Sequence, residues 1–264
     1  MNDSRLARES KNFILIIRSE TLKYFGLRSN PLFLVLVVIG LPLYSIARDA
    51  VANATKAGSL HEGGFDGISS LAVPLAIAFS FHGANSSASE KRFSTNTLSR
   101  LAVPRGVSLL LAKSTVLTLM VGFASLIGAT LAHLVVTQAW SPVLELEPRQ
   151  WEQIVFSTLG FTLFAQFGLA LGSALSPTLA LLSIGGVLAV IPPATSLVFG
   201  QVSAIGDVFS ISAVQALAAV KPAHGFPLEG MALSDLSPQA GLYVVAAWGA
   251  IAFVWAIVKS RHRQ

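Results

Sequence analysis

Long apolar runs dominate this sequence and restrict the folds that it can adopt. One of them follows Pro31, where LFLVLVVIGLPLYSIA continues almost without a polar residue to Arg48. A helix that crosses a lipid bilayer needs about 20 mostly apolar residues. Only 12% of the 264 residues are charged, whereas soluble domains have roughly a quarter. The sequence therefore predicts an all-α membrane protein with a single membrane domain.

The spacing of the apolar runs predicts six membrane-spanning helices within residues 31–264. The residues between these runs are too few and too rich in glycine and proline to form a soluble domain of their own. The spans are expected at about 31–48, 67–88, 108–137, 152–174, 178–199 and 240–258.

Residues 1–30 precede the first span and have the pattern of an amphipathic helix. Leu6, Phe13, Ile17 and Tyr24 fall within about 40° of one another at 100° per residue, while Arg8, Lys11 and Arg18 point away. We expect this segment to form an elbow helix on the cytoplasmic membrane surface that leads into the first span.

The distribution of basic residues predicts the orientation of the chain. Residues 1–30, the connection at 87–113 and the C-terminal tail KSRHRQ together hold fourteen of the eighteen Lys and Arg residues. Basic residues are retained in cytoplasmic loops, so both termini and the 87–113 connection are expected in the cytoplasm. Six spans are consistent with this segregation, because an even number places both termini on one side.

The two connections after the fourth and fifth spans differ in length. The fourth and fifth spans are joined by SPT at 176–178, which predicts a tight hairpin on the cytoplasmic side. The connection at 200–240 contains the apolar segment IGDVFSISAVQALAAV, which is too short to cross a bilayer. Short re-entrant or interfacial helices are therefore expected on the outer side before the sixth span.

The connection between the second and third spans is unusually rich in charge. It reads SASEKRFSTNTLSRLAVPRGVSLLLAK, and cytoplasmic retention alone would explain its basic residues. Hydroxyl and amide residues at 94–97 can start a short helix by capping its first turn, and Pro104 can end it. The order of residues thus adds a short cytoplasmic helix between the two spans.

With this connection the chain resembles the membrane subunits of type 2 ATP-binding cassette exporters. Many of these subunits carry a glutamate, basic residues, Gly-Thr-Leu and Leu-Ala-x-Pro-Arg between the second and third spans, and a lysine as the third begins. Here Asn96 takes the place of the usual glycine. The matching residues are Glu90, Lys91-Arg92, Thr97-Leu98, Leu101-Ala102-Val103-Pro104-Arg105 and Lys113.

The resemblance implies that the connection is a coupling helix that docks on a separate cytoplasmic ATPase. It implies an exporter in the bacterial plasma membrane that works with a second permease, either a copy of itself or a homologous chain. The cargo expected is an amphipathic or hydrophobic molecule such as an antibiotic, an antimicrobial peptide or a lipid. The residues placed at the ATPase contact are Glu90, Arg92, Thr97, Arg100 and Arg105.

Nucleotide chemistry is expected on the partner and not on this chain. The sequence has no Gly-x-x-x-x-Gly-Lys-Ser/Thr loop to hold phosphates, so ATP and Mg would bind to the ATPase subunit. The chain itself is expected to be no enzyme and to bind no cofactor. Membrane lipids are expected partners and nucleic acid is not.

A few polar residues lie within the predicted spans. His82 and Asn85 are three residues apart in the second span, and Gln166 lies in the fourth. Such residues face protein or a water-filled cavity, so they either make interhelical hydrogen bonds or line a substrate path. Gly168 and Gly172 form a Gly-x-x-x-Gly motif that indicates close helix packing.

Other functions require residues that this sequence does not show. Thiolate chemistry is excluded because the chain has no cysteine, and the histidine spacing predicts no metal site. A membrane-embedded enzyme would need convergent catalytic groups, and a secondary transporter driven by an ion gradient would need carboxylates or broken helices at membrane depth. No Asp or Glu clearly lies inside a predicted span, so both remain weaker alternatives.

Overall fold

The computed structural model describes residues 3–54, 72–92, 106–140, 148–185 and 238–261, and this part of the chain is helical apart from short turns. The prediction of an all-α protein is therefore confirmed for these ranges. The seven helices are α1 (Asp3–Gly26), α2 (Ser29–Ala54), α4 (Ala72–Arg92), α6 (Gly106–Trp140), α7 (Pro148–Ala174), α8 (Pro177–Gly185) and α12 (Pro238–Arg261).

Four of these helices are long and apolar enough to cross a membrane. They lie at four of the six predicted positions, and large apolar side chains such as Leu36, Phe123 and Val254 are exposed on their outer faces. An exposed surface of this kind is suited to lipid rather than water, which indicates a membrane protein. The four segments are Ser29–Ala47, Val107–Val135, Trp151–Ala174 and Gln239–Ser260.

The other two predicted spans are represented by α4 and α8. Within its described residues α4 is less apolar than the four long helices, because its second half is rich in polar side chains from His82 to Arg92. The helix α8 covers the first part of the span expected at 178–199, and 186–199 lie outside the described residues. The six-span count therefore stays a prediction, as do the outer helices expected at 200–240, which also lie outside the described residues.

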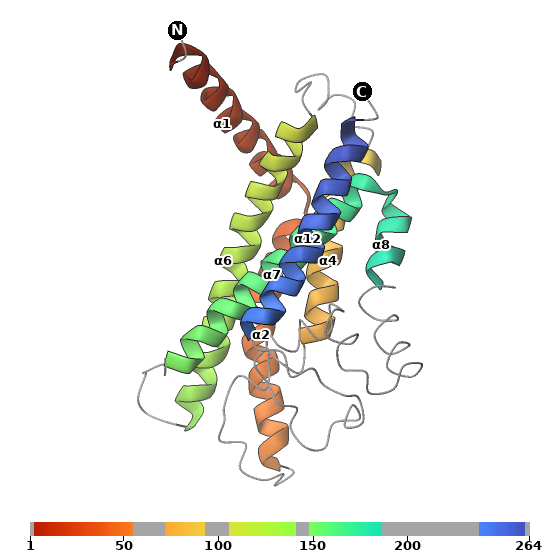
Figure 1. Ribbon diagram of the computed structural model, residues 1–264. Coiled ribbons are helices and arrows are strands. Elements are labelled where there is room, and N and C mark those ends of the chain that lie inside the picture. Colours follow the sequence, from red (N-terminus) through yellow and green to blue (C-terminus); the bar gives the residue numbers. More distant parts are fainter. Residues whose placement is uncertain (1–2, 55–71, 93–105, 141–147, 186–237, 262–264) are drawn as a thin grey trace.

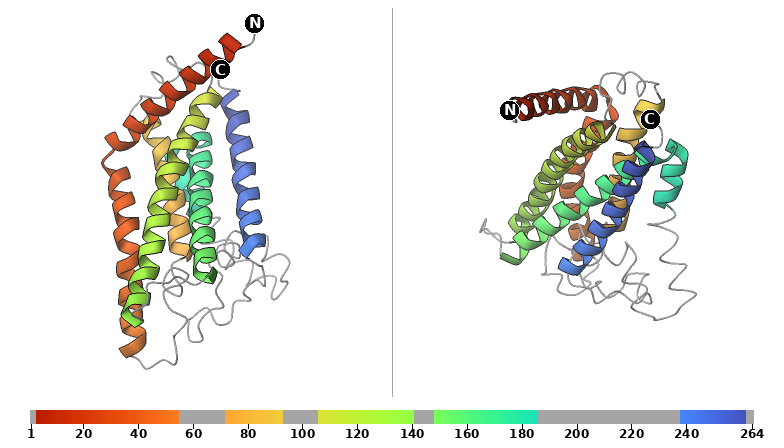
Figure 2. Two further views of the ribbon diagram at one scale, coloured as in Figure 1. Left: turned by 90° about the vertical axis from the view of Figure 1, so that its left-hand side faces the viewer. Right: turned by 45° about the horizontal axis from the view of Figure 1, so that its top comes forward.

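The helix α7 occupies the centre of the bundle. It packs against α4, α6 and α12, while α2 packs mainly on α6 (Figure 1). The buried core at these contacts includes Phe79 of α4, Leu117 of α6, and Ile154, Phe164 and Leu169 of α7. The helix α1 leaves the bundle at an angle (Figure 2).

Successive helices after α1 run in alternating directions. The helix α1 begins and α12 ends at the same end of the bundle, which we call the terminal end (Figures 1 and 2). The helices α2, α6 and α8 run away from the terminal end, and α4, α7 and α12 run toward it. The last turn of α4 and the first turn of α6 therefore both lie at the terminal end.

Three glycines bring α4 and α7 into backbone contact. A Cβ atom added at Gly168 or Gly172 of α7 would collide with the backbone of Ser80 or Ala84 in α4, and one added at Gly83 would collide with Ala165. The hydroxyl of Ser80 also donates a hydrogen bond to the carbonyl oxygen of Phe164 at 3.1 Å. The predicted close packing at Gly168 and Gly172 is confirmed.

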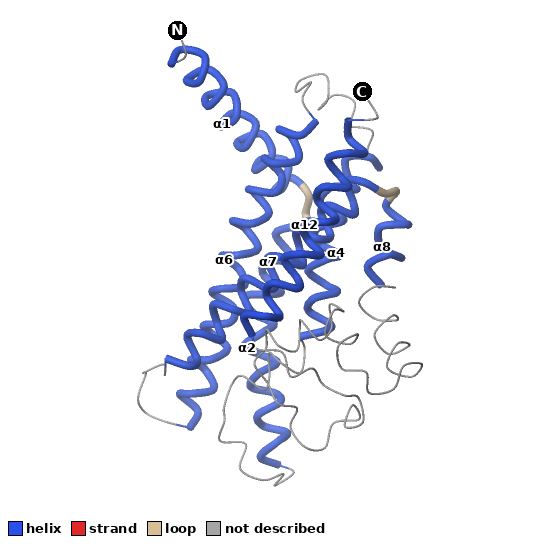
Figure 3. The backbone as a smooth tube through the Cα atoms, viewed as in Figure 1, coloured by secondary structure: helices blue, strands red, loops and turns tan. Residues whose placement is uncertain are grey.

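A two-residue turn joins α7 to α8, as expected for the SPT sequence (Figure 3). The backbone N–H of Leu179 donates to Ser176 Oγ at 3.4 Å, and that of Ala180 donates to Ser176 O at 2.9 Å. Serine before a helix and proline at its first position are both favourable at a helix start. The hairpin places the start of α8 at the terminal end.

The helix expected within 1–30 is present as α1, but its apolar residues occupy two faces. Ile17 and Tyr24 belong to the face predicted to lie on the membrane, yet they pack into the protein core. Ile14 and Leu22, in contrast, are exposed. The reason is that the first turns of α6 lie beside α1 and cover the predicted face, so another face is left open to lipid.

Candidate functional site

Only the ends of the predicted coupling connection lie in the described part of the chain. Glu90 and Arg92 are in the last turn of α4, and α6 starts again at Gly106. Thr97, Arg100 and Arg105 lie within 93–105, outside the described residues. The two ends of the connection are at the terminal end of the bundle (Figure 1).

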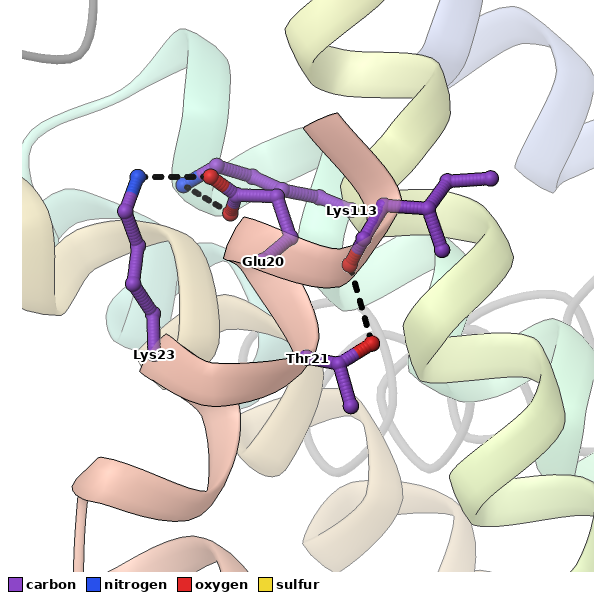
Figure 4. Close-up of polar contacts among 5 residues, drawn as sticks. Glu20, Thr21, Lys23 and Lys113 are labelled. Carbon is purple, nitrogen blue, oxygen red and sulfur yellow. Dashed lines mark hydrogen bonds and ion pairs between the residues drawn. The ribbon is translucent and has the colours of Figure 1, made fainter. Parts of the chain in front are cut away.

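A buried carboxylate joins α1 to the start of α6. Glu20 is only 5% exposed, and its Oε2 lies 3.7 Å from Nζ of Lys113, whose side chain is 11% exposed. Lys23 of α1 is 2.6 Å from Oε1 of the same carboxylate. Figure 4 shows the two lysines reaching Glu20 from different helices. A buried charge is costly unless it is paired, so the two lysines account for a carboxylate at this position.

The hydroxyl of Thr21 beside this ion pair bonds within its own helix. Its Oγ1 donates to the carbonyl oxygen of Ile17 at 2.9 Å (Figure 4). Thr21 is thus held to the α1 backbone one turn earlier. The polar link between α1 and α6 in Figure 4 is the ion pair of Glu20 and Lys113.

One turn after Glu20, a buried hydrogen bond joins α1 to α4. Tyr24 Oη and His82 Nε2 are 2.6 Å apart. Burial raises the pKa of Tyr24 above its ordinary value of 10.0, so the hydroxyl keeps its proton. The side-chain amide of Asn30 donates to the carbonyl oxygen of Tyr24 at 2.9 Å and so fixes the turn between α1 and α2. The start of α2 is thereby held against the same contact.

Aromatic rings extend this contact toward the centre of the bundle. Phe33 of α2 stacks on the His82 ring with centroids 4.1 Å apart, and it meets Phe79 edge to face at 5.3 Å. Phe79 in turn stacks on Phe161 of α7 at 4.8 Å. Such ring pairs add to the burial of their area. A continuous line of rings therefore connects Tyr24 with the central helix.

The three candidate residues for a substrate path have different surroundings. His82 is buried against α1 and α2, and Asn85, less than one turn later, is exposed. Gln166 is bonded to α6, where its Nε2 donates to Ser114 O at 2.9 Å and to Thr118 Oγ1 at 2.7 Å. His82 and Gln166 thus make the interhelical hydrogen bonds that were one of the two alternatives. A role for the three residues in a substrate path stays a prediction.

Sequence reasoning missed Glu20 as a site residue. The pair Glu20 and Lys23, three residues apart on one helix, is readable in the sequence. The contact with Lys113 crosses 93 residues of chain and depends on how α1 packs on α6. Among the described residues, no group of three or more His, Asp or Glu side chains lies close enough to hold a metal ion.

The Tyr24 hydroxyl is expected to make a moderate contribution to stability. Tyr24→Phe keeps the ring but removes the hydrogen bond to His82, and a buried hydrogen bond contributes about 1 kcal/mol. We expect a lower Tm for the purified chain in detergent. Tyr243→Phe is the matched control, because Tyr243 is 73% exposed, and it should leave the Tm unchanged. Equal Tm values for the two variants would contradict the importance of this contact.

No protein-family model matches this chain, and no curated protein matches it significantly.

Proposed function

We propose that this chain is the membrane-spanning permease subunit of an ATP-binding cassette exporter. The observation that carries the proposal is that α4 ends and α6 begins at the terminal end of the bundle (Figure 1). The residues between these two ends have a sequence that resembles the coupling segment of these exporters. A partner protein that binds a charged connection between two helices can act on both helices directly.

The proposed topology has six spans with both termini in the cytoplasm. Its support is the alternation of direction among α2, α4, α6, α7, α8 and α12 (Figure 1). Most of the basic residues belong to 1–30, 87–113 and the C-terminal tail. The described parts of these segments, which are α1, the end of α4, the start of α6 and the end of α12, lie at the terminal end (Figure 1). Basic residues are retained on the cytoplasmic side, so the terminal end faces the cytoplasm and α1 serves as its elbow helix.

The proposed mechanism places the energy source on a separate ATPase with bound ATP and Mg. Glu90, Arg92, Thr97, Arg100 and Arg105 contact this ATPase. Closure of an ATPase dimer on ATP draws the connections of two permease chains together and shifts the population toward an outward-open path. An amphipathic or hydrophobic cargo, such as an antibiotic, an antimicrobial peptide or a lipid, leaves the cytoplasm by this path.

Charge reversal in the connection tests the proposed ATPase contact. We expect Arg100→Glu or Arg105→Glu to lower the affinity for the partner ATP-binding cassette ATPase by about tenfold or more, because an interfacial cation becomes an anion. Affinity is measured with both proteins purified, and membrane insertion is measured in parallel. Arg18→Glu, at an exposed position of α1, is the control and should bind normally. Unchanged affinity in the Arg100 and Arg105 variants would reject the contact.

A further inference from the structure

We propose that α1 is a strap that sets the spacing between the end of α4 and the start of α6, and that Glu20 is the positioning residue of this strap. Its effect on coupling rests on the proposed function. Its effect on helix spacing does not, because the contacts that carry it lie within this chain.

One turn of α1 contacts both α4 and α6. Glu20 and Tyr24 are four residues apart and therefore lie on the same face. Glu20 reaches Lys113 of α6, and Tyr24 reaches His82 of α4. Arg92 is ten residues after His82, or about 15 Å along the helix. His82 therefore lies at the middle of α4 and Lys113 about two turns after the start of α6, so α1 contacts both helices that the connection at 93–105 joins.

The two contacts act against changes in helix spacing. The hydrogen bond between Tyr24 and His82 is 2.6 Å long and the ion pair between Glu20 and Lys113 is 3.7 Å long. If the ends of α4 and α6 move apart, α1 can follow only one of them, and the other contact is lost. Loss of the ion pair leaves a buried carboxylate without its interhelical partner, which is costly. The strap therefore favours the spacing seen here.

Two faces of α1 have different surroundings. The face with Ile17, Glu20 and Tyr24 is covered by protein, whereas Ile14 and Leu22 are exposed apolar residues. Apolar residues on the open face favour burial in lipid. The helix α1 is thus held between the bundle on one face and lipid on the other, and in this position it opposes movement of α4 or α6.

The absence of cysteine makes the spacing measurable in the full chain. Ser86→Cys near the end of α4 and Ser108→Cys near the start of α6 provide two spin-label positions. Double electron–electron resonance spectroscopy in lipid nanodiscs then gives the distribution of distances between the two spin labels. We expect a single narrow distribution in the otherwise native chain, and a broadened or shifted one in Glu20→Gln and Lys113→Gln.

Matched variants separate the strap from a general effect of charge. Lys113→Arg keeps the cation and should keep the narrow distribution. Lys23→Gln and Arg18→Gln remove charges from α1 but keep the ion pair between helices, and both should match the native chain. If Lys113→Gln does not fold, the double variant Glu20→Gln with Lys113→Gln, which removes both charges of the interhelical ion pair, replaces it in the test. Native-like distances in the Glu20 and Lys113 variants, or equal broadening in Lys23→Gln, would overturn the proposal.

Binding of the ATPase distinguishes this proposal from the proposed function. We expect Glu20→Gln to weaken ATPase binding about fivefold or more, a typical size for coupling between separate sites. Lys113→Arg, which keeps the ion pair with Glu20, should bind the ATPase like the native chain. Arg100→Glu should weaken binding with the α4–α6 distances unchanged, because a contact residue acts directly. If the native chain binds no ATPase, the proposed function fails and the distance test still decides on the strap. If Glu20→Gln changes the distances but not the binding, its role in coupling is rejected.

Discussion

Replacing Gly168 by alanine is expected to push α4 away from α7 and to destabilise the folded chain strongly. The added Cβ would meet the carbonyl oxygen of Ser80 and would lie 2.8 Å from its Cα. These are backbone atoms of a packed helix, so no side-chain rotation can relieve the collision. Only a shift of the whole helix would make room.

The cost of such a shift is large because the contact between α4 and α7 is extensive. It buries Phe79 and Phe164 and includes the hydrogen bond from Ser80 to the Phe164 carbonyl. Overpacking a core costs about 1–3 kcal/mol, and more when the backbone has to move. We expect Gly168→Ala to fall at the upper end of this range and Gly168→Leu to give no folded protein. The measurements are the Tm and the monodisperse yield in detergent.

Gly249→Ala provides the matched control. Gly249 lies in the interior of α12, and a Cβ added there would have no atom within 4 Å. Alanine is a better helix former than glycine by about 1 kcal/mol, so this variant should be as stable as the native chain or more so. If Gly168→Ala is as stable as Gly249→Ala, the close contact between α4 and α7 is not present in the native protein.

The helices were predictable to the extent that they are apolar. The runs expected at 108–137 and 152–174 correspond to α6 and α7, which extend a few residues further at most of their ends. Helix ends are hard to place because polar residues occur both in the last turns of a helix and in the loop that follows it. The end of α4 is an example, since Glu90 and Arg92 belong to its last turn and were predicted to follow the span. Hydropathy marks the part of a helix that is in lipid, not its whole length.

The contacts of the site were less predictable than the helices. The Gly-x-x-x-Gly motif predicted close helix packing from its spacing alone, because two small residues four positions apart lie on one face of a helix and let another helix approach. His82 was recognised as a residue in need of a partner, but Tyr24 lies 58 residues away and on another helix. Glu20 lies before the first predicted span, where a carboxylate does not by itself indicate a site. Each of these partners depends on how α1 packs, and α1 has two apolar faces of which the sequence pattern indicated one.

The side of the membrane on which the terminal end lies is expected to give an all-or-none result in thiol labelling. Ser176 is exposed in the turn between α7 and α8 at the terminal end, whereas Glu152 and Gln239 are exposed near the starts of α7 and α12 at the opposite end. The native chain has no cysteine, so a single cysteine at one of these positions is the only target for a thiol reagent.

In intact cells, a membrane-impermeant maleimide should label Glu152→Cys and Gln239→Cys but not Ser176→Cys. After lysis it should label all three, which serves as the control for accessibility. The physical reason for this expectation is the excess of basic residues at the terminal end, because basic residues are retained on the cytoplasmic side of a membrane. If only Ser176→Cys is labelled in intact cells, the terminal end faces the outside. The 93–105 connection could then not meet a cytoplasmic ATPase. The proposed permease function would fall with it, whereas the strap formed by Glu20, a contact within the chain, would remain open to its own test.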